Sequence, residues 1–221
     1  MSLILKKNLL YLHIPKTGGN WLSKIIRDHG CVLRSLEHKH ATYDLVSGRL
    51  RARSFIERKL TLRGVENMQY MAVVRNPLTW YESWFKYQTS NNFRDWGEVG
   101  NPLKWHVMSS INSVKQNDFN EFVLAINQVH PGFVTSLYAA YTARSSAIVI
   151  KNETIRQDFA SINSQFELGI PEAIIFESAE YGISPKLPII WDQKVFEEIL
   201  FKEQACFRTY GYKSDDVVTV R

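Results

Sequence analysis

A lysine and two glycines follow a short apolar run near the start of the chain, in the heptapeptide Pro15-Lys16-Thr17-Gly18-Gly19-Asn20-Trp21. Glycine lets the backbone approach a ligand closely. A helix that begins at such a turn directs unpaired N–H groups, and the positive end of its dipole, toward that ligand. Lys16 adds a full positive charge at the same place. The combination predicts an anion-binding loop, whereas two glycines alone would indicate only a tight turn with a surface lysine. Because the lysine precedes the glycines, the loop does not follow the G-x-x-x-x-G-K-[ST] pattern of ATPases and GTPases.

A second candidate segment is Arg75-Asn76-Pro77, with Ser83 in the helix that should follow it. An arginine at the end of a strand can bind a phosphate through two parallel hydrogen bonds, and a serine hydroxyl can add one more donor. By itself, Arg-Asn-Pro indicates only a helix start with an ion-pairing arginine. Together with the first loop, it favours one ligand that carries two separated anionic groups.

Strands and helices alternate around these two segments. Short apolar runs predict buried strands at 9–14, 70–74 and 147–150, and helical patterns cover 21–28, 77–87, 119–129, 153–168 and 195–207. This alternation predicts an α/β fold, a parallel sheet with helices on both faces, formed by residues 1–221 as a single domain. Both candidate segments would then follow the carboxyl ends of strands, where such sheets bind ligands. Residues 31–68 and 89–117 are expected to form loops or short helices.

Composition and charge narrow the function classes. Of the 221 residues, 45% are hydrophobic and 22% are charged, which is typical of a globular protein and not of a disordered one. Cys31 and Cys206 lie too far apart for a zinc finger or a disulfide scaffold. The apolar runs are too short to span a membrane, and the sequence is not expected to carry a signal peptide, so a soluble, cytoplasmic protein is expected. The net charge of +5 equals that of the basic segment 49–63. This segment indicates an acidic partner or, with equal weight, a solvated helix face.

The two segments resemble those of the sulfotransferases that use 3′-phosphoadenosine 5′-phosphosulfate (PAPS). Residues 13–21 resemble the 5′-phosphosulfate loop, and the H-I-P-K-T-G-G core is most similar to the carbohydrate branch, Golgi-type and bacterial. Arg75-Asn76-Pro77 with Ser83 resembles the 3′-phosphate-binding segment. Weaker similarities in the same order are Lys39-His40-Ala41-Thr42, Ile150-Lys151-Asn152-Glu153 with Asp158-Phe159, and Tyr210-Gly211-Tyr212.

Four positions depart from the carbohydrate-branch pattern. Asn20 and Trp21 stand where that branch usually carries Thr-Ser, and Trp21 is typical of the cytosolic branch that acts on small molecules. Lys151 replaces an arginine, and Cys206 stands where an acid often precedes the closing F-G-Y. These differences leave the type of acceptor open.

The resemblance implies a P-loop-NTPase-like sulfotransferase architecture. It also implies transfer of a sulfuryl group from PAPS, without a metal, to a hydroxyl on a carbohydrate or, alternatively, on a small alcohol or phenol. Lys16 would be catalytic, because it and the helix-end N–H groups can stabilise charge on the bridging oxygen. The PAPS-binding residues implied are Lys16, Thr17, Gly18, Gly19, Asn20, Trp21, Arg75 and Ser83.

Two other function classes compete with this interpretation. A P-loop-type nucleotide kinase would need Mg²⁺-dependent ATP binding, for which the sequence shows neither a standard phosphate loop nor a clear acidic strand end. A nucleic-acid-binding module would use segment 49–63 but would leave the Lys16 loop unexplained. The expected partner is therefore an acceptor glycan or a small hydroxyl compound and not a nucleic acid, and no membrane span is expected.

An acceptor hydroxyl needs a general base, and histidine has a suitable ordinary pKa. The similarity of the segment 39–42 to relatives makes His40 the candidate, with His38 and Glu37 as alternatives. His38 and His40 could also be a pair of metal ligands, but no third ligand stands near them, so no metal site is predicted. His13 is expected to be a packed core residue.

Aromatic residues are concentrated after the second candidate segment. Trp80, Trp84 and Tyr87 share one face of the predicted helix, which indicates core packing. Phe93, Trp96 and Trp105 lie in a polar stretch beyond it and could stack on a sugar or aromatic acceptor.

Overall fold

The computed structural model describes residues 1–36, 38–46, 67–98, 106–143, 147–182, 187–214 and 219–220. The chain divides into two compact units. The sheet unit comprises Met1–Val74 and Ala140–Ile183, and the helical unit comprises Arg75–Ala139 and Ser184–Arg221. That the whole chain forms a single domain stays a prediction. The basic segment 49–63 lies outside the described residues.

The sheet unit is built on five strands in the order β3-β1-β2-β4-β5. The strands are β1 (Leu3–Leu5), β2 (Leu9–Leu12), β3 (Val32–Ser35), β4 (Gln69–Val74) and β5 (Ala147–Lys151). β2, β4 and β5 pair in parallel, with Leu12 opposite Ala72 and Ala72 opposite Val149. These are the three strands that the apolar runs predict, and the α/β class is confirmed.

Two strands that the sequence analysis did not predict extend the sheet on one side. β1 pairs antiparallel with β2 and with β3. The turn between β1 and β2 contains Lys7 and Asn8, both in the left-handed conformation with φ of 61° and 57°. Hairpin turns with this backbone match the twist of the strands that they join. The sheet is therefore mixed, and its parallel part carries the candidate loop.

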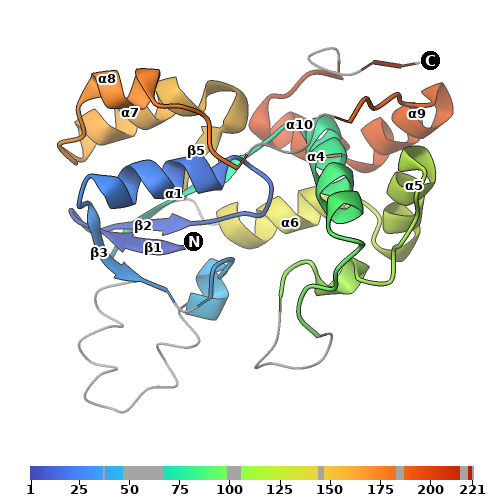
Figure 1. Ribbon diagram of the computed structural model, residues 1–221, viewed down its shortest axis with the longest axis horizontal. Helices are drawn as coiled ribbons and strands as arrows, with labels where there is room; N and C mark the ends of the chain where they lie inside the picture. Colours follow the sequence, from blue (N-terminus) through green and yellow to red (C-terminus); the bar gives the residue numbers. More distant parts are fainter. Residues whose placement is uncertain are drawn as a thin grey trace. The chain divides into compact units, whose positions relative to one another are not determined.

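One face of the sheet packs against α1 (Gly19–Asp28), α7 (Ile155–Gln165) and α8 (Glu172–Glu177), which lie on the same side of it in Figure 1. Side chains alternate between the faces of a strand, so every second residue points to these helices. The buried side chains of this core include Leu9, Tyr11, Met71, Val73 and Ile150 from the strands, and Leu22, Ile25, Ile26, Phe159 and Ile162 from the helices. This packing fixes α1 against the end of β2.

The opposite face of the sheet is buried as well. It carries Leu10, Leu12 and Tyr70, each of which is at most 1% exposed to solvent. Residues 43–46 form a helical turn, and the ring of Tyr43 lies 5.2 Å from the ring of Tyr70. A helical residue therefore packs on this face as well.

The helical unit contains α4 (Pro77–Ser90), the short 3-10 helix η1 (Ser109–Ile111), α5 (Phe119–Val129), α9 (Gln193–Lys202) and α10 (Gln204–Tyr210). It also contains most of α6 (Phe133–Thr142), whose residues from Ala140 onward are assigned to the sheet unit. α4 begins as predicted, because Asn76 accepts a hydrogen bond from Leu78 N at 3.0 Å and Pro77 occupies the first helical position. Phe85 of α4 packs against α5, and its ring centre lies 5.5 Å from that of Phe119 and 5.3 Å from that of Phe122.

The helix predicted over 195–207 is in fact divided at Glu203 into α9 and α10. The Glu203 carboxylate is fully buried. It accepts hydrogen bonds from Tyr81 OH (2.6 Å), Val134 N (2.9 Å), Thr135 N (2.7 Å) and Thr135 Oγ1 (2.7 Å). Val134 and Thr135 belong to the first turn of α6, whose amides need an acceptor from outside the helix. The prediction of one continuous helix is therefore wrong. The local sequence around Glu203 does not reveal that its carboxylate binds Tyr81 and the start of α6, which are far away in the chain.

A second predicted helix, over 153–168, is also shorter than expected. It consists of a 3-10 turn, η2 (Asn152–Thr154), followed by α7, which ends at Gln165. The carboxylate of Asp158 binds the turn, because its Oδ2 accepts from Lys151 N and from Thr154 Oγ1, each at 2.9 Å. This short turn sets the direction in which Asn152 points.

Candidate active site

β2 ends at Leu12 and α1 begins at Gly19, so the predicted anion-binding loop comprises residues 13–18. Lys16 and Gly18 have left-handed backbones, with φ of 64° and 83°. The first hydrogen bond of α1 runs from Trp21 N to the Gly18 carbonyl at 3.1 Å. The N–H groups of Gly19 and Asn20 therefore precede the first intrahelical bond, with the positive end of the helix behind them.

Close contacts require glycine at both positions of the pair. A Cβ on Gly18 would collide with Nδ2 of Asn152, and a Cβ on Gly19 would collide with the His13 ring and the Tyr11 hydroxyl. Tyr11 OH donates to the Gly19 carbonyl at 3.3 Å. Burial raises the pKa of Tyr11, so the hydroxyl stays a donor at neutral pH. The two glycines thus serve the packing of the loop as well as the approach of a ligand.

The other predicted loop residues have different surroundings. Thr17 is fully buried, and its Oγ1 donates to the Ile14 carbonyl at 3.0 Å. Its side chain therefore stabilises the loop, and only its backbone could meet a ligand. Lys16 is half-buried and Asn20 is exposed.

Trp21 packs inside the sheet unit. Its indole is 6% exposed, and Nε1 donates to Ser178 Oγ at 3.0 Å. The Arg156 guanidinium lies 4.9 Å from the ring centre, and the ring of Phe159 meets it edge-on at 6.5 Å. These contacts assign the indole a structural position behind the start of α1.

His40 lies beside the beginning of the loop. It is buried, and its Nδ1 lies 2.9 Å from the carbonyl oxygen of His13, the first residue of the loop. A carbonyl can only accept, so Nδ1 carries the proton and Nε2 carries the lone pair of the neutral ring. Tyr141 OH donates to the His40 carbonyl at 2.6 Å and holds the backbone there. The structure thus brings His40 to the loop. His38 is half-buried, and Glu37 lies outside the described residues.

His13 is a buried core residue, as predicted. Its ring lies 4.8 Å from the His40 ring and stacks with Tyr11 at 6.0 Å. Burial lowers the pKa of His13 well below its ordinary value, and electrostatic coupling to the nearby amino terminus, His40 and Lys39 lowers it further. His13 is therefore neutral at neutral pH.

Asn152 is a loop contact whose importance the sequence analysis missed. It follows β5, and its Nδ2 donates to the Thr17 carbonyl at 3.2 Å. The Asn152 stretch is one of the weaker resemblances in the sequence, but nothing local indicates which residue of it reaches the loop.

Arg75 and Ser83 belong to the helical unit, where Arg75 directly precedes the N-cap residue Asn76 and Ser83 lies within α4. Arg75 Nε donates to Thr79 Oγ1 at 2.9 Å, so the arginine side chain extends along the helix. Ser83 is buried and stands one turn beyond Thr79, and positions four apart lie on the same helix face. The sequence analysis did not single out Thr79 as a contact of Arg75, although Thr79 stands four residues from both Arg75 and Ser83.

Further contacts in the helical unit fix the Arg75 backbone. Tyr138 OH donates to the Arg75 carbonyl at 2.9 Å, and Arg75 N lies 3.2 Å from the same hydroxyl. Asn76 Nδ2 donates to the Lys213 carbonyl at 3.3 Å, and the Tyr210 ring lies 5.7 Å from the Tyr138 ring. The Tyr210-Gly211-Tyr212 segment therefore lies beside the start of α4.

The aromatic residues of α4 pack as predicted. Trp80 and Trp84 are buried, and their rings stack 6.0 Å apart. The half-buried Trp96 ring lies 5.7 Å from Trp84, 5.6 Å from Tyr87 and 4.7 Å from His106. Trp96 is thus part of this packing, and its stacking on an acceptor stays a prediction.

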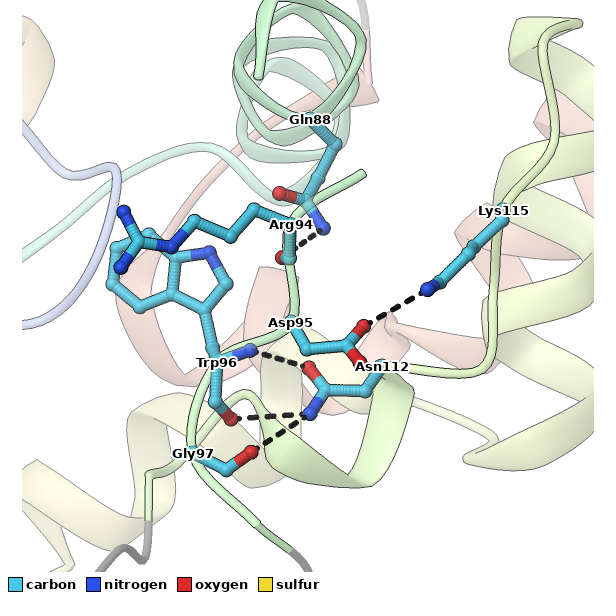
Figure 2. Close-up of polar contacts among 7 residues, drawn as sticks. All are labelled: Gln88, Arg94, Asp95, Trp96, Gly97, Asn112 and Lys115. Carbon is cyan, nitrogen blue, oxygen red and sulfur yellow. Dashed lines mark hydrogen bonds and ion pairs between the residues drawn. The ribbon is translucent and has the colours of Figure 1, made fainter. Parts of the chain in front are cut away.

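Hydrogen bonds hold the chain on either side of Trp96, as Figure 2 shows. Asn112 Oδ1 accepts from Trp96 N at 2.9 Å, and Asn112 Nδ2 donates to the carbonyls of Trp96 and Gly97, each at 3.2 Å. Asp95 and Lys115 form an ion pair of 3.1 Å in the same view. The backbone at Trp96 is therefore anchored to Asn112. Trp105, which was predicted together with Trp96 to stack on an acceptor, lies outside the described residues.

In the part of the chain that the structure describes, no three His, Cys, Asp or Glu side chains come together as ligands for a metal ion. Within the same residues, no helix has the length and apolar character needed to cross a membrane.

The sequence matches no protein-family model, and no curated protein is significantly similar to it. Among solved structures, the chain is similar to the crystal structure of mouse sulfotransferase SULT7A1 complexed with PAP. The TM-score is 0.40 and the identity 14%, over 84% of this chain and 70% of that chain.

Proposed function

We propose that this protein transfers a sulfuryl group from PAPS to an acceptor hydroxyl on a carbohydrate. The observation that carries the proposal is the loop between β2 and α1. It combines two left-handed residues, Lys16 and Gly18, with a helix start at Gly19 whose first N–H groups precede any intrahelical bond. Such a loop suits an anionic group. The resemblance of its H-I-P-K-T-G-G core to the carbohydrate branch supports a carbohydrate acceptor, with a small alcohol or phenol as the alternative.

The loop would hold the 5′-phosphosulfate end of the donor. PAPS supplies a sulfuryl group activated by a phosphate leaving group. Lys16 and the N–H groups of Gly19 and Asn20 would stabilise the negative charge that develops on the bridging oxygen, which is the role of preorganised donors in such reactions. Thr17 would contribute through its backbone only, since its hydroxyl already binds Ile14.

Arg75 and Ser83 would bind the 3′-phosphate. The bond from Arg75 Nε to Thr79 directs the guanidinium along the face of α4 that also carries Ser83. A guanidinium and a hydroxyl on one helix face provide the charge and the additional donor that a phosphate monoester needs.

His40 would accept the proton of the acceptor hydroxyl. The hydrogen bond between Nδ1 and the His13 carbonyl leaves the lone pair on Nε2, the tautomer that a general base requires. His38 and Glu37 stay as alternatives for this role.

Binding is tested by thermal unfolding with adenosine 3′,5′-bisphosphate (the bisphosphate below), ADP and ATP, each with and without Mg²⁺. We expect the bisphosphate to raise the Tm most, and equally with or without Mg²⁺. A larger shift with ATP that depends on Mg²⁺ would instead support a nucleotide kinase.

Transfer is tested with Lys16→Ala, which should lower kcat by about 10²-fold or more because it removes a charge partner of the transition state. The matched control is Lys24→Ala in α1, which breaks only an exposed ion pair with Asp28 of 2.6 Å. We expect the control to keep full activity. A folded Lys16→Ala protein with normal activity would contradict the proposal.

A further inference from the structure

Asn152 joins the end of β5 to the candidate loop across the sheet unit. Its Nδ2 donates to the Thr17 carbonyl at 3.2 Å, a contact between residues 135 positions apart. The same amide packs so closely on Gly18 that a Cβ at Gly18 would collide with it. Asn152 therefore contacts both sides of the peptide bond between Thr17 and Gly18.

That peptide bond needs an external constraint. Gly18 has φ of 83°, and glycine adopts positive and negative φ almost equally well, so its own backbone does not fix the orientation of the peptide. Lys16, with φ of 64°, is in a conformation that is unfavourable for a residue with a Cβ, and such residues persist only where their surroundings hold them. A reversed peptide would exchange the directions of the Thr17 carbonyl and the Gly18 N–H, and an anion is bound by N–H groups and repelled by a carbonyl oxygen.

We propose that Asn152 is a positioning residue that selects the Thr17–Gly18 peptide orientation in which the loop can bind the 5′-phosphosulfate group. The inference rests on the proposed function. Asn152 acts through the loop, because the Nδ2 group that would otherwise be offered to a ligand donates to Thr17. Asp158 supports it by binding Lys151 N and Thr154 Oγ1 on either side of Asn152.

The residue type follows from this role. Aspartate has the same shape but no N–H donor, and its negative charge would lie beside the loop that binds the anion. Alanine would leave the Thr17 carbonyl without this donor. An amide satisfies the carbonyl with no charge.

The test compares Asn152→Ala and Asn152→Asp with Asn163→Ala. Asn163 is a matched control, since its Nδ2 also donates to a backbone carbonyl in the sheet unit, that of Ile170 at 2.9 Å, away from the loop. Calorimetry measures the affinity of each protein for the bisphosphate and for adenosine 3′-monophosphate, which lacks the 5′-phosphate.

For Asn152→Ala we expect about tenfold weaker binding of the bisphosphate, with a larger loss for Asn152→Asp. Affinity for the 3′-monophosphate should not change in either variant, and Asn163→Ala should bind both ligands as the wild type does. An equal loss for the two ligands, or no loss for the bisphosphate, would overturn the inference.

Hydrogen exchange separates this inference from the proposed function. Amides of residues 17–19 should exchange faster in Asn152→Ala than in the wild type or in Asn163→Ala, whether or not a ligand binds. Unchanged exchange in a folded Asn152→Ala protein would overturn the positioning role. A wild type that does not bind the bisphosphate, with faster exchange in the variant, would overturn the proposed function alone.

Discussion

Gly18→Ala should lower the free energy of unfolding by more than the backbone strain of the substitution alone would. An L-residue in the left-handed conformation costs about 1–2 kcal/mol, and the less flexible unfolded chain offsets about 0.4–1 kcal/mol of this. The strain alone therefore costs about 1 kcal/mol. The added Cβ also collides with Asn152 Nδ2, which must move and lose its bond to Thr17. Overpacking adds about 1–3 kcal/mol and the lost hydrogen bond about 1 kcal/mol, giving about 3–5 kcal/mol in total.

Gly169→Ala measures the strain by itself. Gly169 has φ of 79°, close to the 83° of Gly18, and nothing lies within 4 Å of a Cβ built there. For a protein of this size, Gly169→Ala should lower the Tm by about 2–4 °C and Gly18→Ala by at least about 6 °C. Only Gly18→Ala should also weaken bisphosphate binding, by about tenfold or more. Equal Tm losses would refute the collision argument, and unchanged affinity in Gly18→Ala would remove this loop from the donor site.

Three further predictions concern Arg75, His40 and His13. Arg75→Ala should weaken bisphosphate binding roughly 30- to 150-fold, from the loss of about 2–3 kcal/mol, and leave the affinity for adenosine 5′-monophosphate unchanged. Calorimetry checks this, and a similar loss for both ligands would exclude a specific 3′-phosphate contact. His40→Ala should slow transfer by roughly 10²–10⁴-fold and abolish the fall of kcat/KM at acidic pH, because protonated His40 cannot accept a proton; a pH profile unaltered by the substitution would assign the base elsewhere. His13 has a lowered pKa in the folded protein, so the unfolded state binds more protons below about pH 6.5. The free energy of unfolding should therefore fall as the pH drops through that value, by up to about 1.4 kcal/mol per pH unit, and urea titrations of His13→Gln should show a shallower fall.

Features set by local chemistry could be predicted from the sequence. Asn76 accepts from Leu78 N and Pro77 follows it, so the start of α4 depends on two neighbouring residues and was predicted. The three parallel strands were predicted because each is a short apolar run bounded by turn residues. The start of the candidate loop was also predicted, because the loop directly follows one of these apolar runs.

Features set by distant contacts could not be predicted. The left-handed conformation of Lys16 is rare for a lysine and depends on surroundings that its neighbours in sequence do not reveal. Asn152 reaches Thr17 only because β5 lies beside β4, which lies beside β2. The three-residue strand β1 is too short to show an alternating pattern, and its turn at Lys7 and Asn8 contains no glycine.

The buried carboxylate of Glu203 has a consequence for the order in which the chain can fold. It binds Tyr81, which lies 122 positions earlier, and the start of α6, 68 and 69 positions earlier. During synthesis, α4 and α6 leave the ribosome long before Glu203 does, and the sheet-unit segment Ala140–Ile183 is made in between. The helical unit therefore cannot complete its core until the last part of the chain emerges, and contacts of such long sequence separation form slowly. Until then, the Tyr81 hydroxyl and the first amides of α6 lack this acceptor, so the nascent helical unit is exposed to aggregation and to chaperones.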